Sequence, residues 1–466
     1  MTEVIFDSKT INSCWYTSRN TFVKKWPGSI QKNNYLNKTK RIVKGYLCSN
    51  REKYVMKQFE IPAFYKSPII SKVKNLRKAL DPRKRDFEPT LLDFGSIQFY
   101  IARHFGFCYG VENAIEISYR ALAENKEKRI FLLSQMIHNP DVNNDLTSHG
   151  IRFLQDTEGN QLIPFESLRK EDVVIIPAFG ATLEIMNQLE ELEVDVQKYN
   201  TTCPFVEKVW NRSEKLGQQE HTIIIHGKYS HEETRATFSH SSQSAPSIIV
   251  KDLAETKILA DVILGNRPKS DFDVFFKGKC TEGFDVDQHL TKVGVVNQTT
   301  MLASETQEIA DFVRLTMVKK YGAESISQHF ADTRDTLCYA TNDNQNSTLG
   351  LLSISADMAV VVGGYNSSNT THLVELLEPK FPTYFIRNVN DIKSPSEIHH
   401  FDIHAKQERV STNYLPTGEK PTFIITSGAS CPDAMVDRVI HEIMSFYDGV
   451  KDFDTVMTET EARYTV

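Results

Sequence analysis

Apolar and polar positions follow one another in a regular order from residue 96 onward. An apolar run rich in β-branched residues gives way to a polar or glycine-bearing loop, and a segment with helical spacing follows. Strands and helices that alternate in this way predict an α/β protein with parallel sheets. The predicted strands are 98–102, 173–176, 222–225, 293–296, 358–362 and 423–425, and the predicted helices are 111–122, 183–192, 304–318, 372–377 and 433–446.

Three parts of the chain depart from this order. Residues 1–55 carry 11 Lys and Arg against 3 Asp and Glu and show no sustained period. They are either a targeting or disordered leader, or upstream sequence ahead of a natural start at Met56, and we prefer the second interpretation. Residues 56–95 predict an N-terminal arm. Residues 265–290 are rich in Gly, Pro, Asp and Lys and predict a loop insertion, in which Cys280 is incidental.

Composition and charge limit the function. A chain of 466 residues, 40% apolar and 24% charged, should hold two to four domains. The net charge is −6, and outside residues 1–55 it is −14, so the acidic body argues against nucleic acid as a partner. The chain has no run of about 18 apolar residues, so we expect no membrane span. Seven scattered cysteines favour a reducing cytoplasm, with metal or redox use, over a disulfide framework.

Three cysteines stand in short, distinctive frames far apart in the chain. Cys108 lies in Gly-Phe-Cys-Tyr-Gly, Cys203 in Thr-Thr-Cys-Pro, and Cys338 in Leu-Cys-Tyr-Ala-Thr. Each is expected at a junction between a loop and a helix, where the helix N-terminus favours the thiolate. Four thiolates close a metal site, whereas three leave one coordination position for a substrate. Singly, each cysteine is more often a small buried apolar residue, so the hypothesis depends on all three together.

Three polar loops that end predicted strands suit an anion. They are residues 298–300, 366–371 and 427–430, and each combines hydroxyl or amide side chains with a following helix or turn. Backbone N–H groups at such places favour phosphate or diphosphate. The alternative interpretation is an ordinary cluster of helix N-caps. None of the loops matches the Walker pattern, so we infer no nucleotide.

A fourth loop, residues 226–234, concentrates titratable side chains after an apolar strand. It reads His-Gly-Lys-Tyr-Ser-His-Glu-Glu-Thr, and a carboxyl group there with a raised pKa could act as a general acid. His138, in Ile-His-Asn-Pro, is a further candidate for anion contact. His226 and His231 are five residues apart in a loop, and no HExxH is present, so a zinc hydrolase is not indicated.

Eight motifs in order make the chain resemble a known family, 4-hydroxy-3-methylbut-2-enyl diphosphate reductase, the last enzyme of the methylerythritol phosphate route to isoprenoids. The resemblance covers roughly residues 97–445. The motifs are GFCYGV at 106–111, IHNP at 137–140, TTCPFVEKVW at 201–210, HGKYSHEET at 226–234, NQTT at 297–300, CYAT at 338–341, VGGYNSSNT at 362–370 and TSGASCPD at 426–433.

The resemblance implies three α/β lobes with small parallel sheets, related by pseudo-threefold symmetry around a central [4Fe–4S] cluster. Cys108, Cys203 and Cys338 would hold the cluster, and its fourth iron would be open to the substrate's hydroxyl oxygen. Two electrons and two protons would remove that hydroxyl group as water, giving isopentenyl and dimethylallyl diphosphate. Glu233, Thr299 and His231 would be the catalytic residues. The substrate-binding residues would be His138, His231, Thr299, Thr300, Ser367, Ser368, Asn369 and Ser430.

The expected lobes are residues 96–201 with Cys108, 202–336 with Cys203, and 337–435 with Cys338, followed by a C-terminal helix and tail at 436–466. The family implies a ferredoxin or flavodoxin as electron donor. We expect a cytoplasmic location, or a plastid-type organelle if residues 1–55 are a genuine leader.

The chain departs from the family pattern at two places. Phe179 stands where the short bacterial form has a histidine, so one diphosphate contact of that form is missing or replaced. The longer form of plants and cyanobacteria also has phenylalanine at this position. Asn344 and Gln345 stand where the family commonly has Arg-Gln, which puts any role of that arginine in doubt. Cys431 does not match a cluster ligand and is expected to be structural.

Two other functions use the same three cysteines. A zinc enzyme would bind its metal through the three thiolates and keep water in the fourth position. A non-catalytic iron–sulfur sensor would bind a partner without turnover, although the anion loops and the acidic body count against it.

Overall fold

The computed structural model describes residues 60–83, 85–331 and 336–465. The basic segment 1–55 and Met56 lie outside the described residues. Within them, no helix combines the length and the apolarity needed to cross a bilayer.

A sheet of three short parallel strands forms early in the chain. Its strands are β3 (Ile130–Leu132), β4 (Arg152–Phe153) and β5 (Val173–Ile175), in the order β4-β3-β5. All residues of β3 and β5 are buried, as expected for strands covered on both faces. A parallel bridge between Ile176 and Asn200 carries the pairing onward to the loop before Cys203. The helices of this region are α3 (Tyr109–Glu124), α4 (Pro140–Ser148) and α5 (Leu183–Glu191), with a 3-10 turn η4 (Phe165–Ser167).

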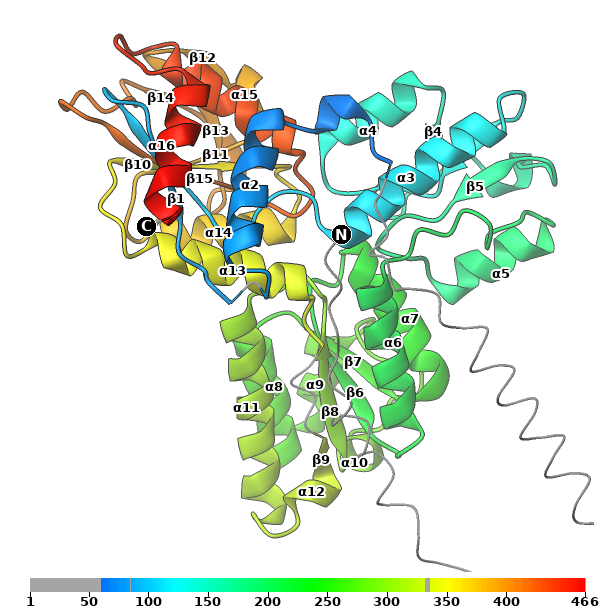
Figure 1. Cartoon of the computed structure of the whole chain (residues 1–466). Coiled ribbons are helices and arrows are strands. Elements are labelled where there is room, and N and C mark those ends of the chain that lie inside the picture. Colours follow the sequence, from blue (N-terminus) through cyan, green and yellow to red (C-terminus); the bar gives the residue numbers. More distant parts are fainter. Residues whose placement is uncertain (1–59, 84, 332–335, 466) are drawn as a thin grey trace, which may run out of the picture. The chain divides into compact units, whose positions relative to one another are not determined.

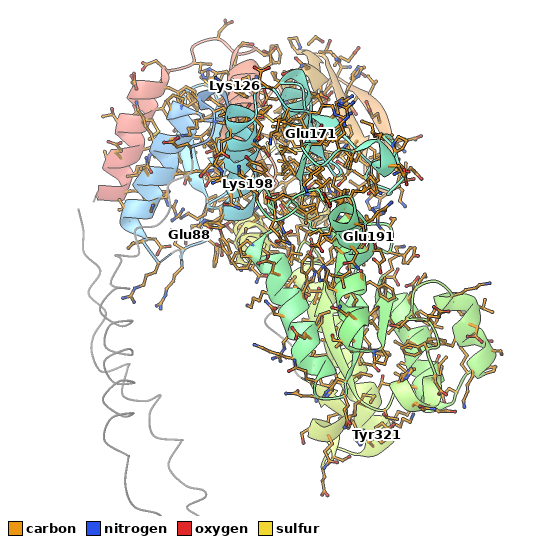
Figure 2. The ribbon with its side chains drawn as sticks, turned by 90° about the vertical axis from the view of Figure 1, so that its right-hand side faces the viewer. Glu88, Lys126, Glu171, Glu191, Lys198 and Tyr321 are labelled. Carbon is orange, nitrogen blue, oxygen red and sulfur yellow. The ribbon has the colours of Figure 1, made fainter. Side chains whose placement is uncertain are left out.

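A second sheet, entirely parallel, has the order β7-β6-β8-β9. Its strands are β6 (Thr222–His226), β7 (Ser247–Val250), β8 (Val293–Asn297) and β9 (Phe330–Ala331). Tyr321, labelled in Figure 2, ends the longest helix packed on this sheet, and its ring stacks on His329 at 3.7 Å between centroids. The helices are α6 (Pro204–Gly217), α7 (Glu232–Ser244), α8 (Leu253–Leu264), α9 (Lys269–Phe276), α10 (Val286–His289), α11 (Ala303–Tyr321) and α12 (Ile326–His329).

The third sheet joins the two ends of the described chain. Its order is β1-β2-β15-β10-β11, with β1 (Thr90–Asp93) antiparallel and the others parallel. The strand β2 (Gln98–Ile101), expected in the first lobe, pairs with β15 (Thr422–Ser427), more than 300 residues later. The other strands are β10 (Met358–Val362) and β11 (Thr383–Ile386), and the helices are α13 (Tyr339–Leu351), α14 (Ser368–Leu377) and α15 (Asp433–Met444).

A small antiparallel sheet is inserted between β11 and β15. Its strands are β12 (Ile392–Ser394), β13 (Glu397–Asp402) and β14 (Gln407–Thr412), preceded by a 3-10 turn η5 (Val389–Asp391). The prediction of an α/β protein with small parallel sheets is confirmed, and this antiparallel sheet is an addition that the sequence pattern did not indicate.

Two segments outside the predicted strands and helices are folded. The N-terminal arm contains a 3-10 turn η3 (Ala63–Tyr65) and the helix α2 (Pro68–Leu80), and the expected C-terminal tail is the helix α16 (Phe453–Thr465). Ile70 and Val73 of α2 and Val456 of α16 are buried in the core of the third sheet. Figure 1 shows α2 and α16 side by side, and the two helices are in contact.

The prediction of a loop insertion at 265–290 was wrong. The segment contains α9 and α10, and Phe272 and Phe276 of α9 are buried, one turn apart, in the core of the second sheet. Cys280 forms an antiparallel bridge with Ile248 at the edge of that sheet. The helical spacing of the two phenylalanines is hidden in the sequence by the polar and glycine residues on both sides.

Candidate functional site

Each of the three cysteines is the N-cap residue of a helix. Cys108 precedes α3, Cys203 precedes α6, and Cys338 precedes α13, all three with extended backbone angles. The junction of loop and helix predicted from the sequence is therefore present in all three frames. These thiols are free in the structure.

The three thiols face one another across a shared pocket. Gly110 makes room for two of them, since a Cβ atom there would lie 2.6 Å from the Cys203 Sγ and 4.0 Å from the Cys108 Sγ. The neighbouring thiol of Cys108 contributes to raising the pKa of both Cys203 and Cys338. Any larger residue at position 110 would fill the space between the thiols.

Burial outweighs the helix N-termini in setting the protonation of these thiols. Desolvation is the largest cause of the raised pKa of Cys108 and Cys338, and it raises the pKa of Cys203 to about 12. Backbone N–H groups of each helix act in the opposite direction but are weaker. The helix N-termini therefore favour the thiolate as expected, but burial has the larger effect, and the net pKa of all three thiols is raised.

The pocket brings together the twelve site residues that the family resemblance implies. Its empty volume is about 660 Å³ when the open mouth is included. Its lining includes all twelve predicted residues: Cys108, His138, Cys203, His231, Glu233, Thr299, Thr300, Cys338, Ser367, Ser368, Asn369 and Ser430. His226, from the same loop as His231, is not among them. Its ring instead bonds the Thr306 hydroxyl at 3.0 Å.

His231 is fixed as a neutral donor. It is the N-cap residue of α7, and its Nδ1 accepts the backbone N–H of Glu233 at 3.2 Å. Burial holds the pKa of the imidazole well below its usual value, so the ring is neutral and its single proton lies on Nε2. A neutral imidazole oriented in this way offers one N–H to the pocket.

Glu233 is fully buried, and desolvation raises the pKa of its carboxyl to about 7. The Thr299 N–H donates to its Oε1, which lowers the pKa but does not offset burial. The carbonyl of Thr299 in turn accepts the Thr341 hydroxyl at 2.9 Å, next to the start of α13. Glu233 can therefore hold a proton near neutral pH while Thr299 links it to the Cys338 loop.

Phe179 packs against both histidines of the pocket. Its ring lies 4.4 Å from the His138 ring and 5.5 Å, edge to face, from the His231 ring, and the two histidines are 4.9 Å apart. Phe179 thus gives each of the two histidine rings an apolar contact.

Two residues that support the site belong to the candidate loops, but the sequence analysis assigned neither of them a role of its own. Glu232 is buried, and its Oε2 lies 3.0 Å from the His138 Nε2. Gln298 is also buried. Its Oε1 accepts from Lys228 N–H and Thr234, and its Nε2 donates to Thr300 and Ser368. Both lie within motifs quoted for the family, but nothing in the local pattern distinguishes them from their neighbours.

The loop at the start of α14 presents an unused donor to the pocket. The Asn369 Oδ1 accepts the Ala429 N–H at 2.9 Å and the Asn344 side chain at 3.4 Å. Within the described part of the chain, the buried Nδ2 of Asn369 has no hydrogen-bond partner. A buried, unpaired donor at a helix N-terminus suits an anionic ligand. Asn344, one of the two departures from the expected family pattern, supports Asn369 through its hydrogen bond.

Three cysteines around one pocket are a donor set that fits a thiolate-bound metal centre. Thiolates that share one zinc ion must all lie about 2.3 Å from the same centre. Among the residues described, no three His, Cys, Asp or Glu side chains converge closely enough to hold one metal ion. Thiolates of a four-iron cluster bind different irons and are further apart, as three separate N-cap positions around one pocket allow.

The sequence matches a known protein family over most of its length. The family model described as LytB protein matches residues 99–444. The chain belongs to the LytB family. The resemblance noted from the eight motifs is thereby confirmed, and the LytB match includes all twelve predicted site residues.

Relatives of this LytB chain carry the same name across cyanobacteria. The chain is 40% identical over 352 residues to a 4-hydroxy-3-methylbut-2-enyl diphosphate reductase of Gloeobacter violaceus, covering 75% of this chain and 83% of the relative. It is 41% identical over 355 residues to a reductase of the same name from a Synechococcus species, covering 76% and 86%. A solved structure of E-1-hydroxy-2-methyl-but-2-enyl-4-diphosphate reductase from Plasmodium falciparum has the same fold, with a TM-score of 0.52, 20% identity and coverage of 74% and 87%.

Proposed function

We propose that the chain is an oxidoreductase that converts 4-hydroxy-3-methylbut-2-enyl diphosphate to isopentenyl and dimethylallyl diphosphate, the last step of the methylerythritol phosphate pathway. The observation that carries the proposal is one pocket lined by three cysteines, a buried carboxyl group and residues of three polar loops. The reaction breaks the allylic C–O bond, consumes two electrons and two protons, and releases water.

Cys108, Cys203 and Cys338 would hold a [4Fe–4S] cluster, which when bound supplies electrons and a Lewis-acidic iron without a protein ligand. We propose that each cysteine comes from its own lobe, residues 96–201, 202–336 and 337–435. A ferredoxin or flavodoxin is the proposed source of electrons, in a reducing compartment that keeps the thiols free.

The rest of the pocket would bind and orient the substrate. The His231 Nε2–H and the Asn369 Nδ2 are donors available to the diphosphate. Ser367, Ser368 and Ser430 line the same pocket. His138, held by Glu232, and Thr300, held by Gln298, complete the binding set. Phe179 supplies no hydrogen bond, and we infer that Asn369 with its Asn344 support partly replaces the missing donor.

Glu233 would deliver the proton. Its raised pKa keeps the carboxyl protonated near neutral pH, and its contact with Thr299 orients it within the pocket that also holds the three thiols. A general acid works best when its pKa lies near the operating pH.

Anaerobic analysis of the full chain tests this function. We expect about four iron and four sulfide per chain, the stoichiometry of this cluster type. We also expect conversion of the hydroxylated diphosphate to both products when a chemical reductant is supplied. Cys203→Ser should lose the cluster absorbance and the turnover together.

The same samples separate the alternatives. Zinc without sulfide would support a zinc enzyme, and a stable cluster without turnover would support a sensor. Retention of both absorbance and turnover in Cys203→Ser would show that the cysteine assignment is wrong.

A further inference from the structure

The helix α2 of the N-terminal arm lies outside the residues matched by the LytB family model, yet it reaches the loop that carries Cys108. The match begins at residue 99, whereas α2 spans Pro68–Leu80. In Figure 1, α2 lies beside α16 and α15, and α2 is in contact with both of these helices. The arm therefore adds to the pocket a support that the family region does not contain.

Lys74 of α2 makes the contact. Its ammonium group donates to the Phe105 carbonyl at 2.9 Å and to the Asp433 Oδ1 at 2.6 Å, and it lies 4.4 Å from the centre of the Phe105 ring. The side chains of Lys74 and Asp433 are 29% and 18% exposed. One partly buried cation thus joins the loop before Cys108 to the start of α15, directly after the Ser430 loop.

Gly106 allows the loop to lie against this ion pair. Its φ of +77° favours glycine, and a Cβ atom there would lie 2.3 Å from the Asp433 Oδ1 and 2.9 Å from the Lys74 Nζ. Two residues later, the Cys108 N–H donates to the Ala429 carbonyl at 3.3 Å. The backbone from residue 105 to 108 is therefore held against the loop 429–433.

The arm also contacts the other side of this loop. The ring of Tyr65 packs edge to face on Phe107 at 5.7 Å, and its hydroxyl donates to the Asp145 carboxylate at 2.6 Å. The residues before and after Gly106 are thus each contacted by a side chain of the arm.

Rigid anchoring of α2 makes these contacts effective. Its N-cap Ser67 is buried and accepts the Ile70 N–H at 2.9 Å. At the other end, the buried Arg77 donates to the Thr90 hydroxyl and to the Tyr464 hydroxyl of α16. Because α2 is held at both ends, the position of Lys74 relative to the Cys108 loop is fixed.

We propose that the N-terminal arm is a clamp on the Cys108 loop, with Lys74 as a positioning residue, and that its role is to retain the metal centre. This rests on the proposed function only in taking Cys108 as a ligand. Lys74 touches neither substrate nor thiol. It acts by fixing the backbone that carries the thiol.

The test measures the thiols themselves in the metal-free full chain. In Lys74→Met, which keeps the apolar stem, Cys108 should be alkylated about tenfold faster than in the wild type, while Cys203 and Cys338 change little. Lys74→Arg should restore much of the protection. After reconstitution, Lys74→Met should release iron to a chelator several-fold faster.

Lys72→Met is the matched control. Lys72 lies on the same helix and pairs with Asp454 of α16 at 2.9 Å, with both side chains largely exposed, so its ion pair joins α2 to α16 and not to the Cys108 loop. It should leave alkylation and iron release unchanged. Asp433→Asn, which weakens the same ion pair from the other side, should act in the direction of Lys74→Met.

Two results would overturn the clamp. One is unchanged alkylation of Cys108 in both Lys74→Met and Asp433→Asn. The other is equal acceleration at all three cysteines, which marks general loss of the fold. Alkylation is measured without metal, so its result tests the clamp independently of the proposed function. The proposed function is contradicted by a different result, a wild-type chain that takes up no iron and sulfide.

Discussion

The Nδ1 of His231 accepts the backbone N–H of Glu233 at 3.2 Å, so one side chain both caps α7 and aims its remaining N–H into the pocket. The two functions sit on different ring nitrogens, and each can be removed without the other. Asparagine places an acceptor near the Nδ1 position, whereas glutamine places a donor near the Nε2 position.

His231→Asn should keep the cap and lose the donor. We expect about tenfold weaker binding of the substrate, because a hydrogen bond to a charged group contributes about 1.5 kcal/mol or more, with little change in the midpoint of unfolding. Isothermal calorimetry with the diphosphate substrate measures the first quantity and thermal unfolding the second.

His231→Gln is the complement. It should bind the substrate more tightly than His231→Asn does. Its free energy of unfolding should fall by about 1 kcal/mol, the usual contribution of an N-cap. If both variants lose binding equally and neither loses stability, the division of roles between the two nitrogens is wrong.

The carboxyl of Glu233 should make stability depend on pH. Its pKa is raised from the ordinary 4.5 to about 7 by burial, so between these values the folded chain holds a proton that the unfolded chain has released. Stability therefore falls as pH rises across this window. Relative to Glu233→Gln, the metal-free wild type should lose about 2 to 3 kcal/mol between pH 5 and 8 in denaturant unfolding. Parallel pH profiles of the two proteins would contradict the raised pKa.

Turnover should depend on the same proton. Because a general acid must be protonated to act, the wild-type rate should fall above about pH 7, and Glu233→Gln should be slower by about 100-fold or more with substrate affinity nearly unchanged. Steady-state assays with a chemical reductant give both quantities. A Glu233→Gln enzyme with normal turnover would remove Glu233 from the proton path.

The ring of Phe179 should matter for binding although it donates nothing. Phe179→Leu removes the contacts with His138 and His231, and we expect a several-fold higher KM, in line with about 1 kcal/mol for aromatic packing. Phe179→Tyr keeps the ring and is the control. Equal KM values for the leucine variant and the wild type would show that Phe179 does not orient the histidines.

Gly110→Ala should prevent uptake of the metal centre. Alanine is the better helix former, so local propensity alone predicts a more stable α3, but its Cβ would lie 2.6 Å from the Cys203 Sγ. Iron per chain after reconstitution should fall well below the wild-type value. Gly418→Ala, where an added Cβ meets nothing within 4 Å, should load normally.

The sequence by itself determined several of the strands that lead into the pocket and offered the candidate residues that line it. The predicted strands at 222–225, 293–296 and 358–362 each match an observed strand to within one residue at either end, because a largely apolar run between polar loops is a local signal. The three cysteines and the anion loops were visible for the same reason, since their frames are short and contiguous.

Only the tertiary structure decided what those residues meet. The pairing of β2 with β15, the bond between Glu232 and His138, and the contact of Lys74 with Asp433 all join positions far apart in the chain, which no local pattern encodes. Protonation was decided at the same level. The helix N-termini lower the pKa of the thiols, but desolvation raises it by more, because desolvation depends on everything packed around a group and not on its own segment.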